Sequence, residues 1–210
     1  MAPDAELTHA WVHGLALARR CPAPVEVPWG LRVDVGRGKE SVRHVLLHTD
    51  GASVRAAAAA ADRPFARIKG FVDPETTLGL LGAAWERDAD ELMMTTVLRR
   101  EEVRLPAGYT AEVERGDGVA HARLLTPDGR FAAGGHTGTH GALAVFDRIE
   151  TDGAHRRRGL GSAVMRLLSD AALDAGAQTA ALGATEEGRA LYSSLGWDLR
   201  GLMAGFVRRT

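Results

Sequence analysis

The sequence predicts an α+β fold, because three observations place strands and helices next to one another along its 210 residues. First, an apolar and β-branched run over residues 142–151 has the character of a strand, and a helical pattern follows at 160–175. Second, the next segments indicate a strand at 179–185, a short helix at 187–195 and a final strand at 199–207. Third, a similar order of segments occurs in the first half of the chain.

The loop between the first of these strands and its helix is basic and rich in glycine. Its residues are Arg156, Arg157, Arg158, Gly159, Leu160 and Gly161. The first amides of a helix lack partners within the helix, and the helix dipole makes this end positive. Because glycine lets the backbone approach an anion and arginine suits phosphate, the loop predicts a phosphate site. On composition alone, a solvated arginine run before a helix explains these residues equally well.

Two motifs in order favour the first interpretation. Arg-x-x-Gly-x-Gly at residues 156–161 directly follows a strand, and the later helix with Tyr192 is followed by Leu-Gly-Trp at 195–197. This combination resembles the GCN5-related N-acetyltransferase (GNAT) family over residues 107–210, about half of the chain. The resemblance implies the GNAT fold, a mixed and mostly antiparallel central sheet flanked by helices. It also implies acetyl-CoA as cosubstrate and transfer of its acetyl group to an amine.

The resemblance further implies which residues contact the cosubstrate. Ile149, Glu150 and Thr151 match the triplet whose backbone pairs with the pantetheine arm. Arg156 fills the leading Arg/Gln position, and the amides that bind pyrophosphate are implied at Arg157, Arg158, Gly159, Leu160, Gly161 and Ser162. Ser162 is also expected to cap the helix. Thr185 stands where an asparagine near the cofactor is often found.

The implied chemistry is acyl transfer from a thioester to an amine, which must be neutral to attack. Tyr192 matches the family tyrosine that protonates the departing thiolate, and a core tyrosine on a short helix is the alternative. Asp147 is the candidate base, because regular alternation puts it on the same face of its strand as Ile149 and Thr151. Glu150 then points the other way, and a bulge in the strand would change this count.

Several other residues are weaker candidates. His121, His136 and His140 are alternatives for the base, although each also fits a surface or turn position. His155 precedes the basic loop and is expected to pack there or to bind phosphate. Cysteine and histidine residues do not have the spacing of metal ligands, so no metal is expected. The single cysteine, Cys21, excludes an internal disulfide.

The first half of the chain repeats the layout of the second. When Trp85 is aligned with Trp197, residues 65–85 correspond to 177–197, each with a strand, a loop, a helix and a tryptophan. The first copy has only Thr-Asp-Gly at 49–51 in place of the basic loop.

This comparison predicts two halves. Residues 1–106 are expected to be a degenerate GNAT-like half that binds no cofactor, and an unrelated α+β subdomain is the alternative. Residues 107–210 are expected to be the acetyl-CoA-binding, catalytic half, and residues 105–108 the linker. Leu80 stands in the first half where Tyr192 stands in the second.

The remaining segments are assigned from periodicity and turn residues. Helices are predicted at 7–18, at 52–61 and from Asp73-Pro74 to Trp85. Strands are predicted at 31–35, 43–48, 65–71, 91–99, 109–114, 119–125 and 129–134, with a connector at 21–30 and a turn at 134–141. The two helices that usually follow the first GNAT strand are missing, so the first half is expected to supply the wall of the acceptor site.

Charge and hydropathy limit the possible partners. The net charge of −1 leaves no electrostatic footprint for nucleic acid. No run of eighteen apolar residues is present, and the acidic N-terminus lacks the apolar core of a signal peptide. We therefore expect a cytoplasmic protein that contacts no membrane. The sequence leaves a homodimer open.

Two functional hypotheses follow. The first is an acyl-CoA-dependent N-acetyltransferase that acts on a small-molecule amine or a peptide amino terminus. The second is a non-catalytic CoA-binding or regulatory module with the same fold. A nucleic-acid binder that uses the three arginines is disfavoured by the net charge. The sequence does not identify the acceptor.

Overall fold

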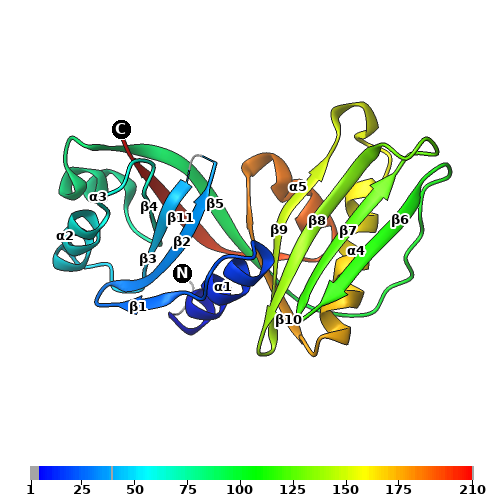
Figure 1. The fold of residues 1–210 in the computed structure, drawn as a ribbon, viewed down its shortest axis with the longest axis horizontal. Helices are drawn as coiled ribbons and strands as arrows, with labels where there is room; N and C mark the ends of the chain where they lie inside the picture. The colour runs from blue at the N-terminus through cyan, green and yellow to red at the C-terminus, as the bar shows by residue number, and fades with distance from the viewer. Residues whose placement is uncertain (1–4, 39, 210) are drawn as a thin grey trace.

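The computed structural model describes residues 5–38 and 40–209, which form one eleven-stranded sheet flanked by helices (Figure 1). Residues 1–4, the start of the acidic N-terminal segment, lie outside the described residues. The helices are α1 (Ala5–Ala18), α2 (Gly51–Ala60), α3 (Pro74–Leu81), α4 (Leu160–Asp174) and α5 (Glu186–Ser194), with a 3-10 turn at Gly153–His155. The strands are β1 (Val25–Val27), β2 (Gly30–Arg37), β3 (Glu40–Leu46), β4 (Arg67–Gly70), β5 (Trp85–Val97), β6 (Thr110–Gly116), β7 (Val119–Leu125), β8 (Phe131–His140), β9 (Leu143–Thr151), β10 (Thr179–Ala184) and β11 (Asp198–Arg208).

The sheet is mixed and mostly antiparallel, as predicted. Its strand order is β1-β2-β3-β4-β11-β5-β10-β9-β8-β7-β6. Only β3 with β4 and β9 with β10 are paired in parallel in the described part of the chain. Each parallel pair is joined by a helix, α2 or α4, as a crossover between parallel strands requires.

The order of elements is repeated, which confirms the layout inferred from the two tryptophans. The series β3-α2-β4-α3-β5 has the same order and pairing as β9-α4-β10-α5-β11. The first residues of α3 and α5, Pro74 and Glu186, are 112 positions apart, as are Trp85 and Trp197. The two series are therefore two copies of one scaffold.

The two copies exchange their last strands. β5 of the first copy pairs with β10, whereas β11 of the second copy pairs with β4 (Figure 1). At the centre of the sheet β5 and β11 pair with each other, and Glu91 lies opposite Met203. These two residues are themselves 112 positions apart, so a pseudo-twofold axis passes between them. Neither copy has a complete sheet without a strand from the other.

Helices cover the sheet differently on its two faces. α4 packs on β7, β8 and β9, and α2 and α3 cover the corresponding face of the first copy, each over its own apolar cluster. α1 lies on the opposite face, against β8 and β9 of the second copy (Figure 1). Its approach is close: a Cβ atom on Gly138 would lie 2.4 Å from the carbonyl oxygen of Gly14. A helix of the first half thus covers a face of the second half.

Three predictions about local structure are wrong. The connector expected at residues 21–30 contains a short strand, β1, which pairs with β2. The helix expected to reach Trp85 ends at Leu81, because Gly82, with a φ of +83°, stops it and Trp85 begins β5. The turn expected at residues 134–141 is instead part of β8. Its glycines mark close packing and not a turn, since a Cβ on Gly135 would lie 2.4 Å from Cδ1 of Ile149.

Among the helices in the described residues, none has the length and apolar character needed to cross a membrane.

Candidate functional site

A cleft opens where β9 and β10 separate. The two strands are paired from Leu143 with Thr179 to Phe146 with Leu182, and the pairing ends there. Beyond that point lies a cleft of about 740 Å³. It is lined by Phe146, Asp147, Arg148, Ile149, Glu150, Thr151, Arg156, Arg157, Gly159, Leu160, Gly161, Ser162, Leu182, Gly183, Thr185, Glu187, Gly188, Leu191 and Tyr192. All but Arg158 of the thirteen residues selected from the sequence therefore line one cleft.

A bulge in β9 determines which face of the sheet each side chain of this strand points to. Arg148 has a φ of +52°, and the register of β9 with β8 shifts by one residue between Gly134 and His136. Ile149 consequently packs into the cluster under α4, whereas Asp147 faces α1. The expectation that Asp147 shares a face with Ile149 is wrong, because an extra residue in the bulge reverses the alternation.

The basic loop ends in an uncapped helix. The N-cap of α4 is Gly159, with a φ of +77°, and no side chain caps the helix. Ser162 lies inside the first turn, so the prediction that it caps α4 is wrong. Leu160 is buried, and a Cβ on Gly161 would lie 3.0 Å from Cδ2 of Leu191. Gly159 and Gly161 place no side chain of their own over the first amides of α4, which lie at the cleft beside Leu191, and this suits an anion.

The three arginines of the loop differ in their partners. Arg156 forms an ion pair with Glu187 at 3.1 Å across the cleft mouth. Arg158 donates a hydrogen bond to the hydroxyl of Tyr109 at 3.0 Å, and that hydroxyl lies 2.9 Å from Nδ1 of His155. Arg157 is exposed and lines the cleft. Arg157 is thus the guanidinium of this loop best placed for a bound anion, while His155 and Arg158 hold the loop to Tyr109.

Thr185 caps a helix and also lines the cleft. It is the N-cap of α5, and its hydroxyl accepts a hydrogen bond from the amide of Gly188 at 3.1 Å. Because the hydroxyl is used in this way, Thr185 starts the helix that carries Tyr192.

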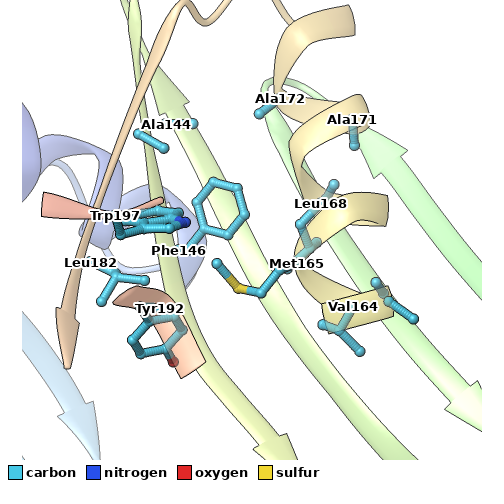
Figure 2. Packing of buried hydrophobic residues seen from close by; sticks show 14 of the residues in the cluster. Ala144, Phe146, Val164, Met165, Leu168, Ala171, Ala172, Leu182, Tyr192 and Trp197 are labelled. Atoms are coloured by element: carbon cyan, nitrogen blue, oxygen red, sulfur yellow. The ribbon is translucent and has the colours of Figure 1, made fainter. Parts of the chain in front are cut away.

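Tyr192 lies on α5 at the inner end of the cleft. Its ring packs 6.1 Å from that of Trp197, and its hydroxyl points away from Trp197 (Figure 2). Burial, followed by the negative charge of Asp147, raises the pKa of Tyr192 to about 12. The phenol therefore keeps its proton at neutral pH. Among the described residues, no side chain or backbone group forms a hydrogen bond with this hydroxyl.

Asp147 is held by α1. Both of its oxygens accept hydrogen bonds from Arg19, at 2.8 and 3.0 Å, and its side chain is only 12% exposed. Arg19, at the end of α1, also lies 3.4 Å from Glu40. The carboxylate is therefore fixed beside Tyr192 by a residue of the first half.

The histidines occupy the α1 face or the adjoining strand ends. His136 lies opposite Asp147 in β8, and its ring is 4.1 Å from that of His121. Burial and the neighbouring His121 lower the pKa of His136 to about 4, so it is neutral at pH 7. His140 stacks on His13 of α1. In the part of the chain that the structure describes, no three potential ligands are grouped so that they could hold a metal ion.

Sequence reasoning missed five charged residues on this face, namely Arg19, Glu40, Arg43, Lys69 and Glu91. Arg19 binds Asp147, and Lys69 of β4 binds Glu91 of β5 at 2.8 Å. The sequence contains one signal, a charged residue within an otherwise apolar strand, at Lys69 and at Glu91. Composition alone does not distinguish such a buried residue from a charged residue on the exposed face of a strand.

Comparison with known proteins decides the family. The sequence model described as acetyltransferase (GNAT) family matches residues 75–197, from α3 to the residue before β11. The chain belongs to the GNAT family. Acetyl transfer is the activity of this family, and the match includes the cleft, the α4 loop and Tyr192 of this GNAT protein.

Solved structures show the same fold. A GCN5-related N-acetyltransferase from Kribbella flavida is 18% identical, with a TM-score of 0.72 over 100% of this chain and 97% of that one. A tandem GNAT protein from the clavulanic acid biosynthesis pathway is 14% identical, with a TM-score of 0.55 over 75% and 67%. A GCN5-related N-acetyltransferase-like protein from Streptococcus suis is 13% identical, with a TM-score of 0.54 over 87% and 85%. A search of curated protein sequences found no match.

Proposed function

We propose that this GNAT protein transfers the acetyl group of acetyl-CoA to an amine of a small molecule or a peptide amino terminus. The observation that carries the proposal is that one cleft contains both the uncapped start of α4 and the protonated phenol of Tyr192. The first feature suits a pyrophosphate, and the second suits a leaving group that needs a proton.

The residues present fit acetyl-CoA. The amides at the start of α4 and the free guanidinium of Arg157 are the groups proposed to hold the pyrophosphate. β9 has no strand partner on its β10 side beyond Phe146, so the backbone of Ile149, Glu150 and Thr151 is available to the pantetheine arm. When bound, the cosubstrate supplies an activated acetyl group as a thioester.

Two side chains are proposed to handle protons. Tyr192 gives its phenolic proton to the sulfur that leaves the acetyl group. Asp147 accepts the proton that the amine loses, and it does so with one of its two hydrogen bonds from Arg19 opened. Asp147 thus links the chemistry to the position of α1.

A non-catalytic CoA-binding module is the second candidate. It is favoured by the observation that Arg19 occupies both oxygens of Asp147. The cytoplasmic location expected from the sequence fits either candidate and stays a prediction.

CoA release distinguishes the two candidates. The purified protein is incubated with acetyl-CoA and with spermidine, tyramine, lysine or an alanine-terminated peptide, and free thiol is measured. Release that depends on one of these amines, together with an acetylated product in a mass spectrum, supports the enzyme. Saturable binding of acetyl-CoA without release in the presence of any of them supports the module.

A further inference from the structure

A cluster of charged side chains joins the two copies on the α1 face. We call it the interface charge cluster, and its members are Arg19, Glu40, Arg43, Lys69, Glu91 and Asp147. Arg19 connects Asp147 to Glu40, and Arg43 binds Glu40 at 2.6 Å. Five of the six residues precede the second copy in sequence, so this face of the cleft region is built largely by the first half.

Glu91 stands at the middle of this cluster. It lies opposite Met203 on the pseudo-twofold axis and shares the α1 face with Met93. Its Oε1 accepts a hydrogen bond from Nζ of Lys69, which is almost fully buried. Although burial opposes ionisation, the charges of Arg43 and Lys69 hold the pKa of Glu91 at about 2. The carboxylate is therefore charged at neutral pH.

The second oxygen of Glu91 lies beside Gly183, a residue of the cleft lining. A Cβ atom on Gly183 would be only 2.5 Å from Oε2 of Glu91, and Gly183 lines the cleft just past the point where β9 and β10 separate. No side chain of β10 therefore stands between this oxygen and the cleft at that level.

The two carboxylates beside the opening differ in what they can still bind. Both oxygens of Asp147 accept hydrogen bonds from Arg19. In the described part of the chain Oε2 of Glu91 has no hydrogen-bond donor, and its side chain is 23% exposed. Glu91 is thus the carboxylate with an open acceptor atom.

We propose that Oε2 of Glu91 accepts a hydrogen bond from an N–H of the acceptor amine and so orients the amine for attack. The inference rests on the proposed acetyl transfer and assigns the amine anchor to the first half of the chain. A neutral amine can donate one N–H to the carboxylate and still keep its lone pair for the acetyl carbonyl. Glu91 is in this account a residue that positions the amine.

Steady-state kinetics with spermidine and tyramine as probes test the inference. Glu91→Gln keeps an acceptor for Lys69 and removes the charge, so KM for the amine should rise at least about tenfold, whereas KM for acetyl-CoA should not change. Gly183→Ala should act in the same direction, because its Cβ displaces Oε2. Glu86→Gln is the matched control on the same strand, since Glu86 pairs with Arg209 at the surface.

The possible outcomes separate the two proposals. An unchanged amine KM in folded Glu91→Gln, with turnover by the parent protein, overturns the inference and leaves acetyl transfer in place. An equal rise of KM for acetyl-CoA and for amine also overturns it, because Glu91 then supports the cleft as a whole. A parent protein that binds acetyl-CoA but releases no CoA with spermidine, tyramine, lysine or the alanine-terminated peptide contradicts the proposed function and the inference together.

Discussion

The first turns of α2 and α4 occupy equivalent positions in the two copies, but their backbone amides differ in their hydrogen-bond partners. In α2 the side chain of Asp50 accepts hydrogen bonds from the amides of Ala52 and Ser53, both at 3.0 Å. In α4 the N-cap is Gly159, and no side chain caps the helix. A carboxylate of the protein therefore occupies the first amides of α2, whereas no side chain of the described residues bonds to the first amides of α4.

The same contrast holds for the other site residues. Val45 pairs with Lys69 as Val145 pairs with Ala181, so Leu47 in the first copy corresponds to Asp147 in the second. Leu80 likewise corresponds to Tyr192. The first copy thus keeps the scaffold but has Leu47 and Leu80 where the second copy has Asp147 and Tyr192. It also contributes β5, α1 and the interface charge cluster to the surroundings of the second copy.

The largest expected effect is the loss of acetyl-CoA binding in Gly161→Glu. Gly161 is the second residue of α4, so a carboxylate there places negative charge against the anion site. Isothermal titration should show no binding. Ala52→Glu, at the second residue of α2, is the matched control and should bind as the parent does. Gly161→Ala tests the added Cβ alone, and full acetyl-CoA affinity in folded Gly161→Glu would disprove the site.

Tyr192→Phe tests the second difference between the copies. The variant keeps the buried ring and loses a hydroxyl that has no protein partner among the described residues. We expect kcat to fall by roughly 10²–10⁴-fold, the usual range for general acid catalysis, with unchanged acetyl-CoA affinity and melting temperature. Turnover at the parent rate would show that water protonates the thiolate.

The first copy should contribute to the pH dependence of stability through His44, in addition to any contribution from His136 in the second copy. His44 is fully buried and its counterpart in the second copy is Ala144. Burial, followed by Arg32, lowers the pKa of His44 to about 4, whereas the unfolded chain takes up this proton near pH 6.5. Stability is therefore lost as pH falls from 6.5 to 4, by up to about 3 kcal/mol from this residue. Urea unfolding of His44→Leu at pH 7 and pH 4 should show a smaller difference than the parent, and an equal difference would contradict the assignment.

The smallest expected effect comes from removing the cap of α2. Asp50→Ala leaves the amides of Ala52 and Ser53 without their acceptor and should lower the free energy of unfolding by about 1 kcal/mol. Acetyl-CoA binding at α4 should be unaffected. A weaker affinity for acetyl-CoA in Asp50→Ala would show that the N-terminus of α2 influences binding at the N-terminus of α4.

Local pattern was sufficient to predict most elements and the α4 loop. The helical spacing after Gly159 and the alternation in β7 are properties of short segments, and both were found from the sequence. The strand exchange was not, because the pairing of β5 with β10 depends on contacts about 90 residues apart in sequence. The bulge at Arg148 was not predicted either, since a positive φ at an arginine has no residue signal. The role proposed for Glu91 depends on the strand exchange, because the pairing of β5 with β10 brings Glu91 beside Gly183.

The number of acetyl-CoA molecules bound per chain tests the contrast between the two copies most directly. Isothermal titration of the parent protein should give one equivalent, and Gly161→Glu should remove it. Two equivalents per chain, or one that persists in folded Gly161→Glu, would contradict the account, because the first copy would then bind the cosubstrate too.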